Sequence, residues 1–279
     1  MKEHLKRTVE SYFPGKPRKI GKIDIKYKKK MDEAVVKKAV EFIRDNTITP
    51  GYWDGLVVGI SDGLDGVTTA ALAIKAVGKE KVFGVITNLG GIKEHGEQER
   101  LAVQSAKALG IDYKIVKAGK IYKETQALVK ERGPFTNVNI GIRLIQNVIF
   151  QIAEEKNYAV MSTINKSETL TGRVTEDFYG HIAPLAGLYK SEIFDLAKVL
   201  NVPKEIIARK PGGVDTWYDE DTFGVTYDIL DKMLYLLVEK NMTPAQIAKK
   251  YNFDERWITR LHFRTKQRFW RLTTKELTF

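Results

Sequence analysis

Apolar residues follow two alternating patterns along the first two thirds of the chain. Short runs rich in β-branched residues predict strands, at 56–60, 81–86, 113–116 and 158–162. Between them apolar residues recur every three or four positions, which predicts helices at 31–46, 67–77, 97–109, 121–130 and 138–156. The buried strands are apolar throughout, as in parallel strands that are covered on both faces. The alternation therefore predicts an α/β fold, in which a parallel sheet is flanked by helices.

The last third of the chain is predicted to be mostly helical. Helices are expected at 190–200, 203–208 and 226–240, followed by a C-terminal helical pair that opens at Thr243 and Pro244. A chain of 279 residues can bury one full α/β core, and nothing in its composition forces a division. We predict a basic N-terminal extension at 1–30 and a single α/β domain at 31–279, helical from about residue 190.

The net charge of +11 is concentrated at the two ends of the chain. Basic ends fit a nucleic-acid contact, an attraction for polyphosphate substrates, or a solvated lysine-rich surface, and we favour the last. Arginines and aromatic residues interleave at 256–264, as in nucleic-acid binders. Their helical spacing favours ordinary packing of a C-terminal helix over a helix-turn-helix DNA reader. A nucleic-acid partner is therefore not expected.

Composition excludes several further classes of protein. No apolar run approaches the roughly 18–20 residues that a membrane span requires, and the first residues lack the apolar segment of a signal peptide. We therefore expect a cytoplasmic protein without a membrane contact. The chain has no cysteine, which excludes disulfides, thiolate nucleophiles and thiolate metal sites.

The most informative segment, 61–66, joins the apolar run 56–60 to the helix predicted at 67–77. It reads Ser61-Asp62-Gly63-Leu64-Asp65-Gly66. A strand that ends in small residues and restarts as a helix directs backbone N–H groups and the positive end of a helix dipole at one point. This arrangement suits a phosphate or pyrophosphate, although here an aspartate stands inside it.

A second polar cluster follows the strand predicted at 158–162. It consists of Thr163, Asn165, Lys166, Ser167 and Glu168. In an open parallel sheet, the loops at the carboxyl ends of the strands surround one site, so this cluster is expected near 61–66. Asp65 and Glu168 form a carboxylate pair that suits a magnesium ion bridging phosphates. Lys190, at the start of a helix, is placed to neutralise phosphate charge.

At these residues the chain resembles the ammonia-dependent NAD synthetases of the PP-loop group of ATP pyrophosphatases. The family's Ser-Gly-Gly-x-Asp-Ser loop corresponds to 61–66, and its Gly-Thr-x-x-x-x-Glu segment corresponds to 162–168, followed by Thr171-Gly172. Similar matches occur at 184–190, 202–207 and 219–227. The resemblance runs from about residue 31 to about 268 and is most specific at 158–231. It implies a Rossmann-like fold of the adenine nucleotide alpha hydrolase-like type.

The resemblance also implies a reaction and a set of partners. ATP would adenylate the nicotinate carboxylate of deamido-NAD, and ammonia would then displace AMP to give NAD. Ammonia is expected to be free or delivered by a partner, because no glutaminase domain is recognised. The implied cofactors are ATP and Mg²⁺, and the implied assembly is a homodimer.

Roles are transferred residue by residue from the family. The cofactor-binding set is Ser61, Gly63, Asp65, Gly66, Thr163 and Lys190, of which Asp65 and Lys190 are also assigned to catalysis. Asp65 and Glu168 would hold the metal. The substrate-binding set is Asn137, Arg143, Asp219, Glu220 and Lys266, the first two on a helix that contacts the dinucleotide across the dimer interface.

Several departures from the family fall at the same site. Asp62 replaces a loop glycine, Gly66 replaces the closing serine, and Gly141 replaces an arginine. The segment 174–180 is shortened and lacks a lysine, and the C-terminal His-Lys-Arg becomes 265–267, Thr-Lys-Gln. An unpaired charge about 4 Å from phosphate costs about 1 kcal/mol in water and about 4 at an effective dielectric of 20. Asp62 would then weaken pyrophosphate binding, unless it points to solvent, binds a metal or signals another ligand.

Three functions therefore stay open. The first is an ATP-dependent amide ligase, acting on deamido-NAD or on another carboxylate. The second is a catalytically impaired homologue that keeps the fold and binds or regulates. The third is an RNA-modifying PP-loop enzyme with basic ends that grip RNA. The intact residues Thr163, Glu168 and Lys190 favour the first. The departures at Asp62, Gly66 and Gly141 and the missing lysine favour the second, and we expect the first.

Overall fold

Four parallel strands form the centre of the computed structural model, which describes residues 13–90, 93–130, 133, 135–175, 180–212 and 218–272. The side chains of 93–95 and 267–272 are outside this description. The strands are β1 (Gly55–Gly59), β2 (Val82–Asn88), β3 (Asp112–Lys117) and β4 (Tyr158–Met161), in the spatial order β3-β2-β1-β4. In the register, Leu56 lies opposite Val82 on one side and Ala159 on the other. The predicted α/β fold and the four predicted strands are confirmed, but β3, expected to be covered on both faces, is an edge strand and is largely exposed.

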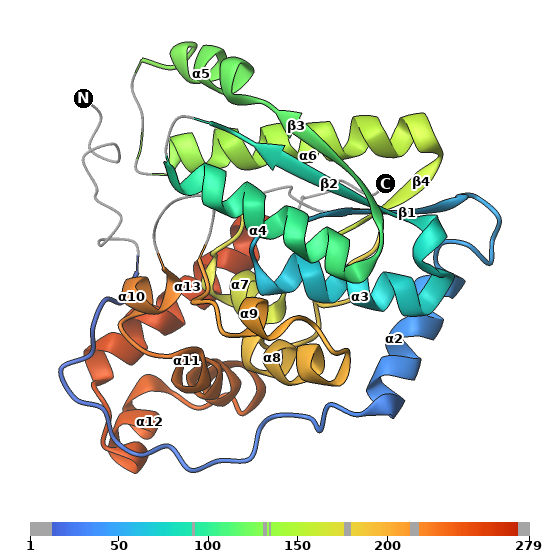
Figure 1. Ribbon diagram of the computed structural model, residues 1–279. Helices are drawn as coiled ribbons and strands as arrows, with labels where there is room; N and C mark the ends of the chain where they lie inside the picture. The colour runs from blue at the N-terminus through green and yellow to red at the C-terminus, as the bar shows by residue number, and fades with distance from the viewer. Residues whose placement is uncertain are drawn as a thin grey trace, which may run out of the picture.

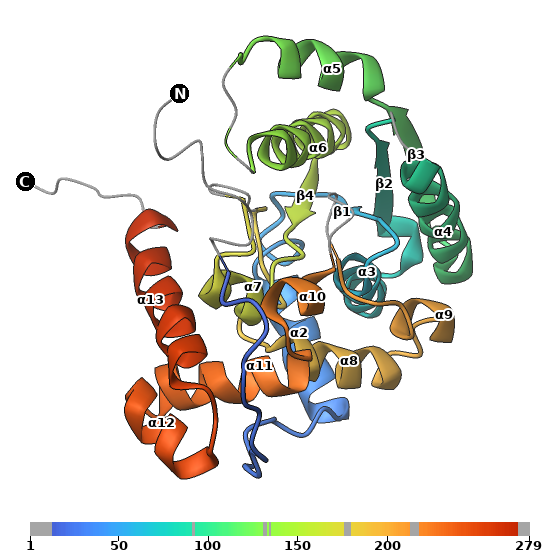
Figure 2. The ribbon, with the colours of Figure 1, turned by 90° about the vertical axis from the view of Figure 1, so that its left-hand side faces the viewer.

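Helices cover both faces of this sheet (Figure 2). The helices α3 (Leu64–Val77) and α4 (Lys93–Leu109) lie on one face, with α2 (Glu33–Asp45) beside α3. The helices α5 (Gly119–Ala127) and α6 (Thr136–Lys156) lie on the other. Strand residues alternate between the two layers, because Leu56 and Val58 join the cluster around α3 whereas Val57 joins Ile149 and Ile152 of α6.

The C-terminal third wraps below the sheet as helices (Figure 1). They are α7 (Lys166–Thr171), α8 (Lys190–Val199), α9 (Lys204–Ile207), α10 (Asp219–Phe223), α11 (Tyr227–Leu234), a π-helical turn (Tyr235–Glu239), α12 (Pro244–Tyr251) and α13 (Glu255–Leu272). The predicted terminal pair is confirmed, and α12 begins with a capping box between Thr243 and Gln246. Trp257 and Leu261 are buried in the helical core, as expected for ordinary packing.

Residues 13–30 run across these helices (Figure 1). Phe13 is buried and makes an edge contact with Phe223. The indole of Trp257 donates a hydrogen bond of 2.6 Å to the carbonyl of Gly15, and Asp254 N donates to Lys19 O at 3.1 Å. The described part of the extension is therefore packed on the helical region, and the boundary at residue 30 stays a prediction.

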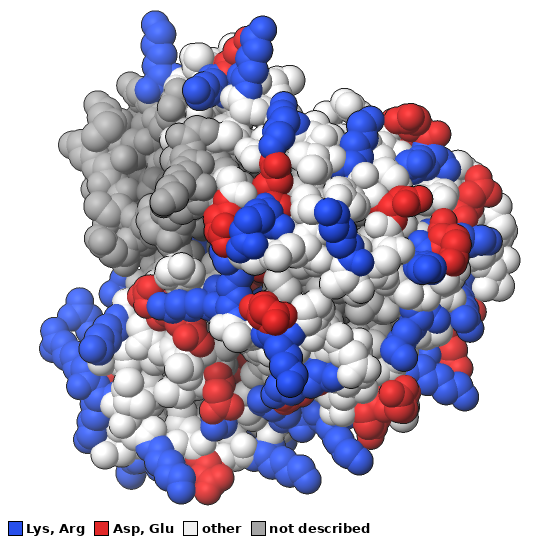
Figure 3. Space-filling view, viewed as in Figure 1, with Lys and Arg blue, Asp and Glu red and all other residues white. Residues whose placement is uncertain are grey.

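The face of the molecule seen in Figure 3 carries no single basic patch. In Figure 3 the Lys and Arg side chains are interspersed with Asp and Glu. Among the described residues, no helix combines the length and the apolar character needed to cross a bilayer.

Candidate functional site

The first loop is shorter than the sequence pattern predicts. Strand β1 ends at Gly59, Ile60 N donates to Val85 O at 2.9 Å, and α3 already begins at Leu64 with Gly63 as its N-cap. Asp65 is thus in the first helical turn and not in the loop. Among the described residues, no side chain caps this helix, so its first-turn N–H groups are left without a side-chain acceptor at the N-cap. Such a terminus suits an anion, as the sequence predicts for phosphate.

Packing of α3 on β1 explains why glycine occupies position 66. Gly66 is buried, and a Cβ atom built on it would lie 2.7 Å from the carbonyl oxygen of Gly59. A serine at this position therefore requires the helix to move away from the strand. The glycine at position 66 is therefore matched to the close approach of helix and strand.

Gly141 has a similar explanation. A Cβ atom there would lie 2.7 Å from the side chain of Leu89 and 3.4 Å from the ring of Tyr122. A larger residue at 141 would therefore require these neighbouring side chains to shift.

Strand order brings the two predicted carboxylates to the same place. β1 is flanked by β2 and β4, so the chain order reverses between β1 and β4, where ligands bind in open sheets. Asp65 follows β1, and Glu168 lies on α7 directly after β4. Lys190 begins α8, is only 4% exposed, and forms an ion pair with the Asp65 carboxylate.

The charges of this group set the protonation of Glu168 and of Lys190. Burial raises the pKa of Glu168 to about 8; the neighbouring Asp65 carboxylate acts in the same direction, and Lys190 opposes both. Burial alone would lower the pKa of Lys190, but Asp65 and Glu168 outweigh it and the pKa is raised. Lys190 therefore stays an ammonium ion, whereas Glu168 takes up a proton near neutral pH when no metal ion is bound.

The carboxylate pair fits a magnesium ion. Asp65 Oδ1 is buried and has no hydrogen-bond partner, so this oxygen is left available as a ligand. Glu168 Oε2 accepts one hydrogen bond of 3.0 Å, from Asn165 N. Within the described residues no three acidic or histidine side chains gather into a metal site, but Mg²⁺ is commonly held by one or two carboxylates together with substrate phosphates.

Asp219, predicted to bind substrate, lies in a buried group next to this site. The Arg173 guanidinium forms an ion pair with one oxygen of Asp219, and the hydroxyl of Tyr227 donates to the other at 2.7 Å. Glu220 accepts from the backbone N–H of Tyr227 at 3.0 Å and so caps α11. Both acidic side chains are bound to other groups of the protein, and their contact with substrate stays a prediction.

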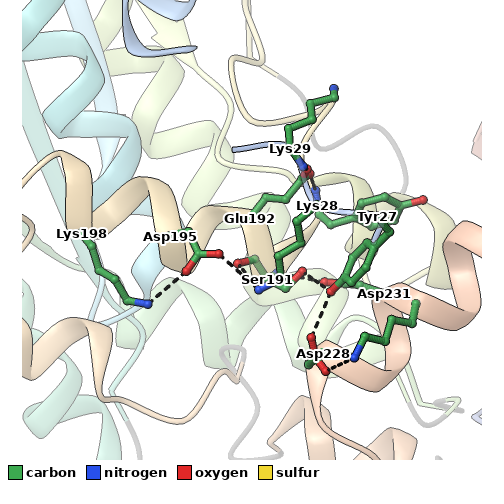
Figure 4. A network of polar contacts seen from close by, with 11 residues as sticks. Tyr27, Lys28, Lys29, Ser191, Glu192, Asp195, Lys198, Asp228 and Asp231 are labelled. Atoms are coloured by element: carbon green, nitrogen blue, oxygen red, sulfur yellow. Dashed lines mark hydrogen bonds and ion pairs between the residues drawn. The ribbon is translucent and has the colours of Figure 1, made fainter. Parts of the chain in front are cut away.

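The start of α8 is held by a hydrogen-bond network (Figure 4). The buried Asp231 accepts from Ser167 Oγ at 2.6 Å and from Ser191 N at 2.9 Å. On the outer side, the Tyr27 hydroxyl lies 2.9 Å from Ser191 Oγ, and Lys28 forms an ion pair with Asp195 at 3.2 Å. Residues of the N-terminal segment thus support the helical turn that carries Lys190.

Asp62 does not point into solvent. The residue is 8% exposed, and its carboxylate forms an ion pair with Arg209, which follows α9. Burial raises the pKa of Asp62, while the Arg209 guanidinium opposes this shift. An unpaired repulsive charge, considered from the sequence, is therefore not what the loop contains.

The remaining predicted residues lie on several different elements. Ser61 is exposed and its hydroxyl accepts from Gly63 N at 3.0 Å, whereas Thr163 is half-buried in the loop after β4. Asn137 and Arg143 are exposed on α6, and six helical residues place them about 9 Å apart along the axis and about 120° apart around it. Lys266 is exposed on α13.

Two comparisons of sequence bear on this arrangement. The family model described as NAD synthase matches residues 35–274. The chain belongs to the NAD synthase family. The NH(3)-dependent NAD(+) synthetase of Thermococcus sibiricus is 37% identical over 223 residues, which cover 78% of this chain and 86% of the relative. The enzyme of the same name from Pyrococcus furiosus is 34% identical over 230 residues, covering 80% and 85%.

Solved structures share the fold of this NAD synthase family member. An NH3-dependent NAD synthetase from Campylobacter jejuni, in complex with nitrate, has a TM-score of 0.72 at 24% identity and covers 89% of this chain and 100% of that chain. The NMN synthetase from Francisella tularensis also has a TM-score of 0.72, at 23% identity, covering 88% and 98%. At these identities the likeness concerns the fold.

Sequence reasoning missed two arginines of the site. Arg209 pairs with Asp62, and Arg173 pairs with Asp219. The acidic residue in the loop was a signal that some cation lies nearby, but nothing in the sequence distinguishes Arg209 from the many other basic residues.

Proposed function

We propose that the protein is an ATP-dependent amide ligase of the NAD synthetase type. It joins ammonia to the nicotinate carboxylate of deamido-NAD and forms NAD, AMP and pyrophosphate. One observation carries this proposal: in a chain of the NAD synthase family, Lys190, Asp65 and Glu168 meet at the point where the strand order reverses. Ligands bind at this point in sheets of this type.

The reaction needs two displacements. An oxygen of the nicotinate carboxylate attacks the α-phosphorus of ATP, and pyrophosphate leaves. The nitrogen of ammonia then attacks the acyl carbon, AMP leaves with the carboxylate oxygen, and the nitrogen loses its proton. The protein contributes position and charge stabilisation to both displacements.

The chain's own residues supply these contributions. The first-turn N–H groups of α3, with Ser61 and Gly63, would bind phosphate oxygens, and Thr163 would contact ATP. The buried ammonium of Lys190 would neutralise negative charge that builds up on the phosphates. Because Lys190 is enclosed, its interaction with that charge is screened less than in water.

Asp65 and Glu168 would hold Mg²⁺, which neutralises and orients the phosphates when it is bound. Binding of the ion requires Glu168 to release its proton. Uptake of magnesium with ATP should therefore release a proton near neutral pH.

A homodimer and a cytoplasmic location are part of the proposal. The exposed positions of Asn137 and Arg143 on α6 suit contacts with a dinucleotide held between two copies of the chain. Asp219, Glu220 and Lys266 would contribute to the same substrate from the helical region.

The test is product formation by the purified protein with MgATP, deamido-NAD and ammonium chloride. NAD, AMP and pyrophosphate should appear in equal amounts, and omission of any substrate should stop all three. Nicotinate mononucleotide serves as the comparison substrate: a preference for it would replace the proposed acyl substrate with a shorter one.

A matched pair of variants gives the control. Lys190→Met should abolish turnover, whereas Lys198→Met on the same helix removes an exposed charge and should leave it unchanged. Turnover by Lys190→Met at the wild-type rate would contradict the proposed role of Lys190.

A further inference from the structure

Asp62 and Arg209 join two segments of the nucleotide site that are distant in the sequence. Asp62 lies in the loop between β1 and α3, and Arg209 lies two residues after α9, which contacts α3. Their side chains form an ion pair, and the side chain of Asp62 is 11% exposed and that of Arg209 32% exposed. The pair is therefore partly shielded from water, and each charge is felt more strongly than at an open surface.

Arg209 is the cation that is paired with the negative charge of this loop. Glu97 on α4 adds a second negative charge close to Asp62 and Arg209, and it pairs with Arg100 on its own helix. Asp62 is a loop position at which the family pattern has glycine. A negative side chain at this position opposes the phosphates for which the first turn of α3 is suited.

We infer that Arg209 is a charge-compensating residue of the nucleotide site, which engages the Asp62 carboxylate and thereby lets the altered loop accept the polyphosphate of ATP. The inference rests on the proposed function, because it assumes that ATP binds at this loop. Arg209 acts here through Asp62 and is a positioning residue. It does not need to contact phosphate itself.

This role differs from two others that an arginine beside a phosphate loop can have. A direct phosphate ligand is needed whether or not Asp62 is present. A purely structural ion pair stabilises the fold but leaves ATP affinity unchanged. Only compensation predicts that loss of Arg209 alone weakens ATP binding and that the additional loss of Asp62 restores it.

A double-mutant cycle separates these roles. MgATP is titrated by calorimetry, without deamido-NAD, into the wild type, Asp62→Gly, Arg209→Gln and the double variant at about 0.15 M salt. Loss of Arg209 alone should raise the Kd by about tenfold or more, because it leaves a carboxylate uncompensated beside the phosphates. Loss of Asp62 alone should lower the Kd, and the double variant should bind within about threefold of the wild type.

Two results would overturn the inference. If the double variant binds as weakly as Arg209→Gln, Arg209 is a direct phosphate ligand. If neither single substitution changes the Kd by more than about twofold, the ion pair is structural. Lys210→Gln is the matched control, because it removes a positive charge at the residue next to Arg209. The Lys210 side chain pairs with Asp221 and not with Asp62, so this variant should change the Kd by less than about twofold.

A second variant tests the inference if Arg209→Gln does not fold. Thermal unfolding is recorded for each variant, and if Arg209→Gln does not fold, Asp62→Asn decides: its Kd should fall, and an unchanged or higher Kd overturns the inference. Absence of ATP binding by the wild type would overturn the proposed function as well. ATP binding without NAD formation would overturn only the proposed function, and the cycle would still decide the role of Arg209.

Discussion

Replacing Glu168 by glutamine should stabilise the protein at alkaline pH while removing its response to magnesium. Glu168 sits among Asp65, Lys190 and Asp219, and burial is the main cause of its raised pKa, from 4.5 to about 8. Its protonated form is therefore the one that the folded chain prefers when no cation is bound. Glutamine imitates this neutral form and cannot ionise.

The direction of the pH effect follows from proton binding. Between pH 4.5 and 8 the folded state keeps the proton of Glu168 while the unfolded state has lost it, so stability falls as the pH rises. The loss is complete above the folded-state pKa. A shift of this size corresponds to roughly 5 kcal/mol, and water at the exposed edge of the half-buried residue reduces this to roughly 2–4 kcal/mol.

The assay is thermal unfolding of wild type and Glu168→Gln without nucleotide, at pH 5 and at pH 9. At pH 9 the variant should melt about 5–10 °C higher, and at pH 5 the difference should shrink to about 2 °C or less. Added MgATP should raise the melting temperature of the wild type much more than that of the variant. Glu155→Gln, at an exposed position of α6, is the control and should match the wild type at both pH values.

An equal difference in melting temperature at pH 5 and pH 9 would refute this reasoning. It would mean that Glu168 does not titrate between these values in the folded protein.

Three further outcomes follow from the packing of the site. Restoring the family's serine, as Gly66→Ser, should destabilise the protein by about 1–3 kcal/mol, because the added Cβ would lie 2.7 Å from Gly59 O; Gly187→Ser, in open space, should cost far less by the same denaturant titration. Tyr27→Phe removes the hydroxyl beside Ser191 and should cost about 0.5–1.5 kcal/mol of stability and lower kcat more than it changes KM for ATP, whereas a fall in stability with kcat unchanged would restrict Tyr27 to the fold. Asp219→Asn weakens the ion pair with the largely buried Arg173 and should lower the melting temperature even without substrate; an unchanged melting temperature would contradict the buried pair.

Much of the fold follows from local pattern. The β-branched run at 56–60 and the helical spacing at 138–156 each reflect which side chains of one element are buried. They correspond to β1 and α6, respectively. Strand order is a different matter. The sequence places Asp65 and Glu168 after strands, but only the pairing of β1 with β4 puts those two strand ends side by side.

Tertiary packing decided what local pattern could not. Helix α3 starts at Leu64, earlier than apolar periodicity indicates, because Gly66 allows its first turn to approach Gly59. The helix α7 was missed although its signal was present: Asn165 and Glu168 form a capping box. A polar segment after a strand was interpreted only as a ligand loop, while the same residues also begin a helix.

The partners of the acidic residues were also beyond local reasoning. Arg209 lies 147 positions after Asp62 in the numbering, and Arg173 lies 46 positions before Asp219. Nothing in the spacing of a lysine-rich chain selects these arginines. Charges at the predicted site can be located from sequence, but the charges that balance them come from the fold.

The central claim is that this chain activates a carboxylate by adenylation, and transfer of an oxygen isotope tests it most directly. Deamido-NAD labelled with ¹⁸O in the nicotinate carboxylate is converted with MgATP and ammonia, and the products are examined by mass spectrometry. Adenylation of the carboxylate predicts one labelled oxygen in the phosphate of AMP for each NAD formed, and none in pyrophosphate. Unlabelled AMP, or label in pyrophosphate, would contradict it.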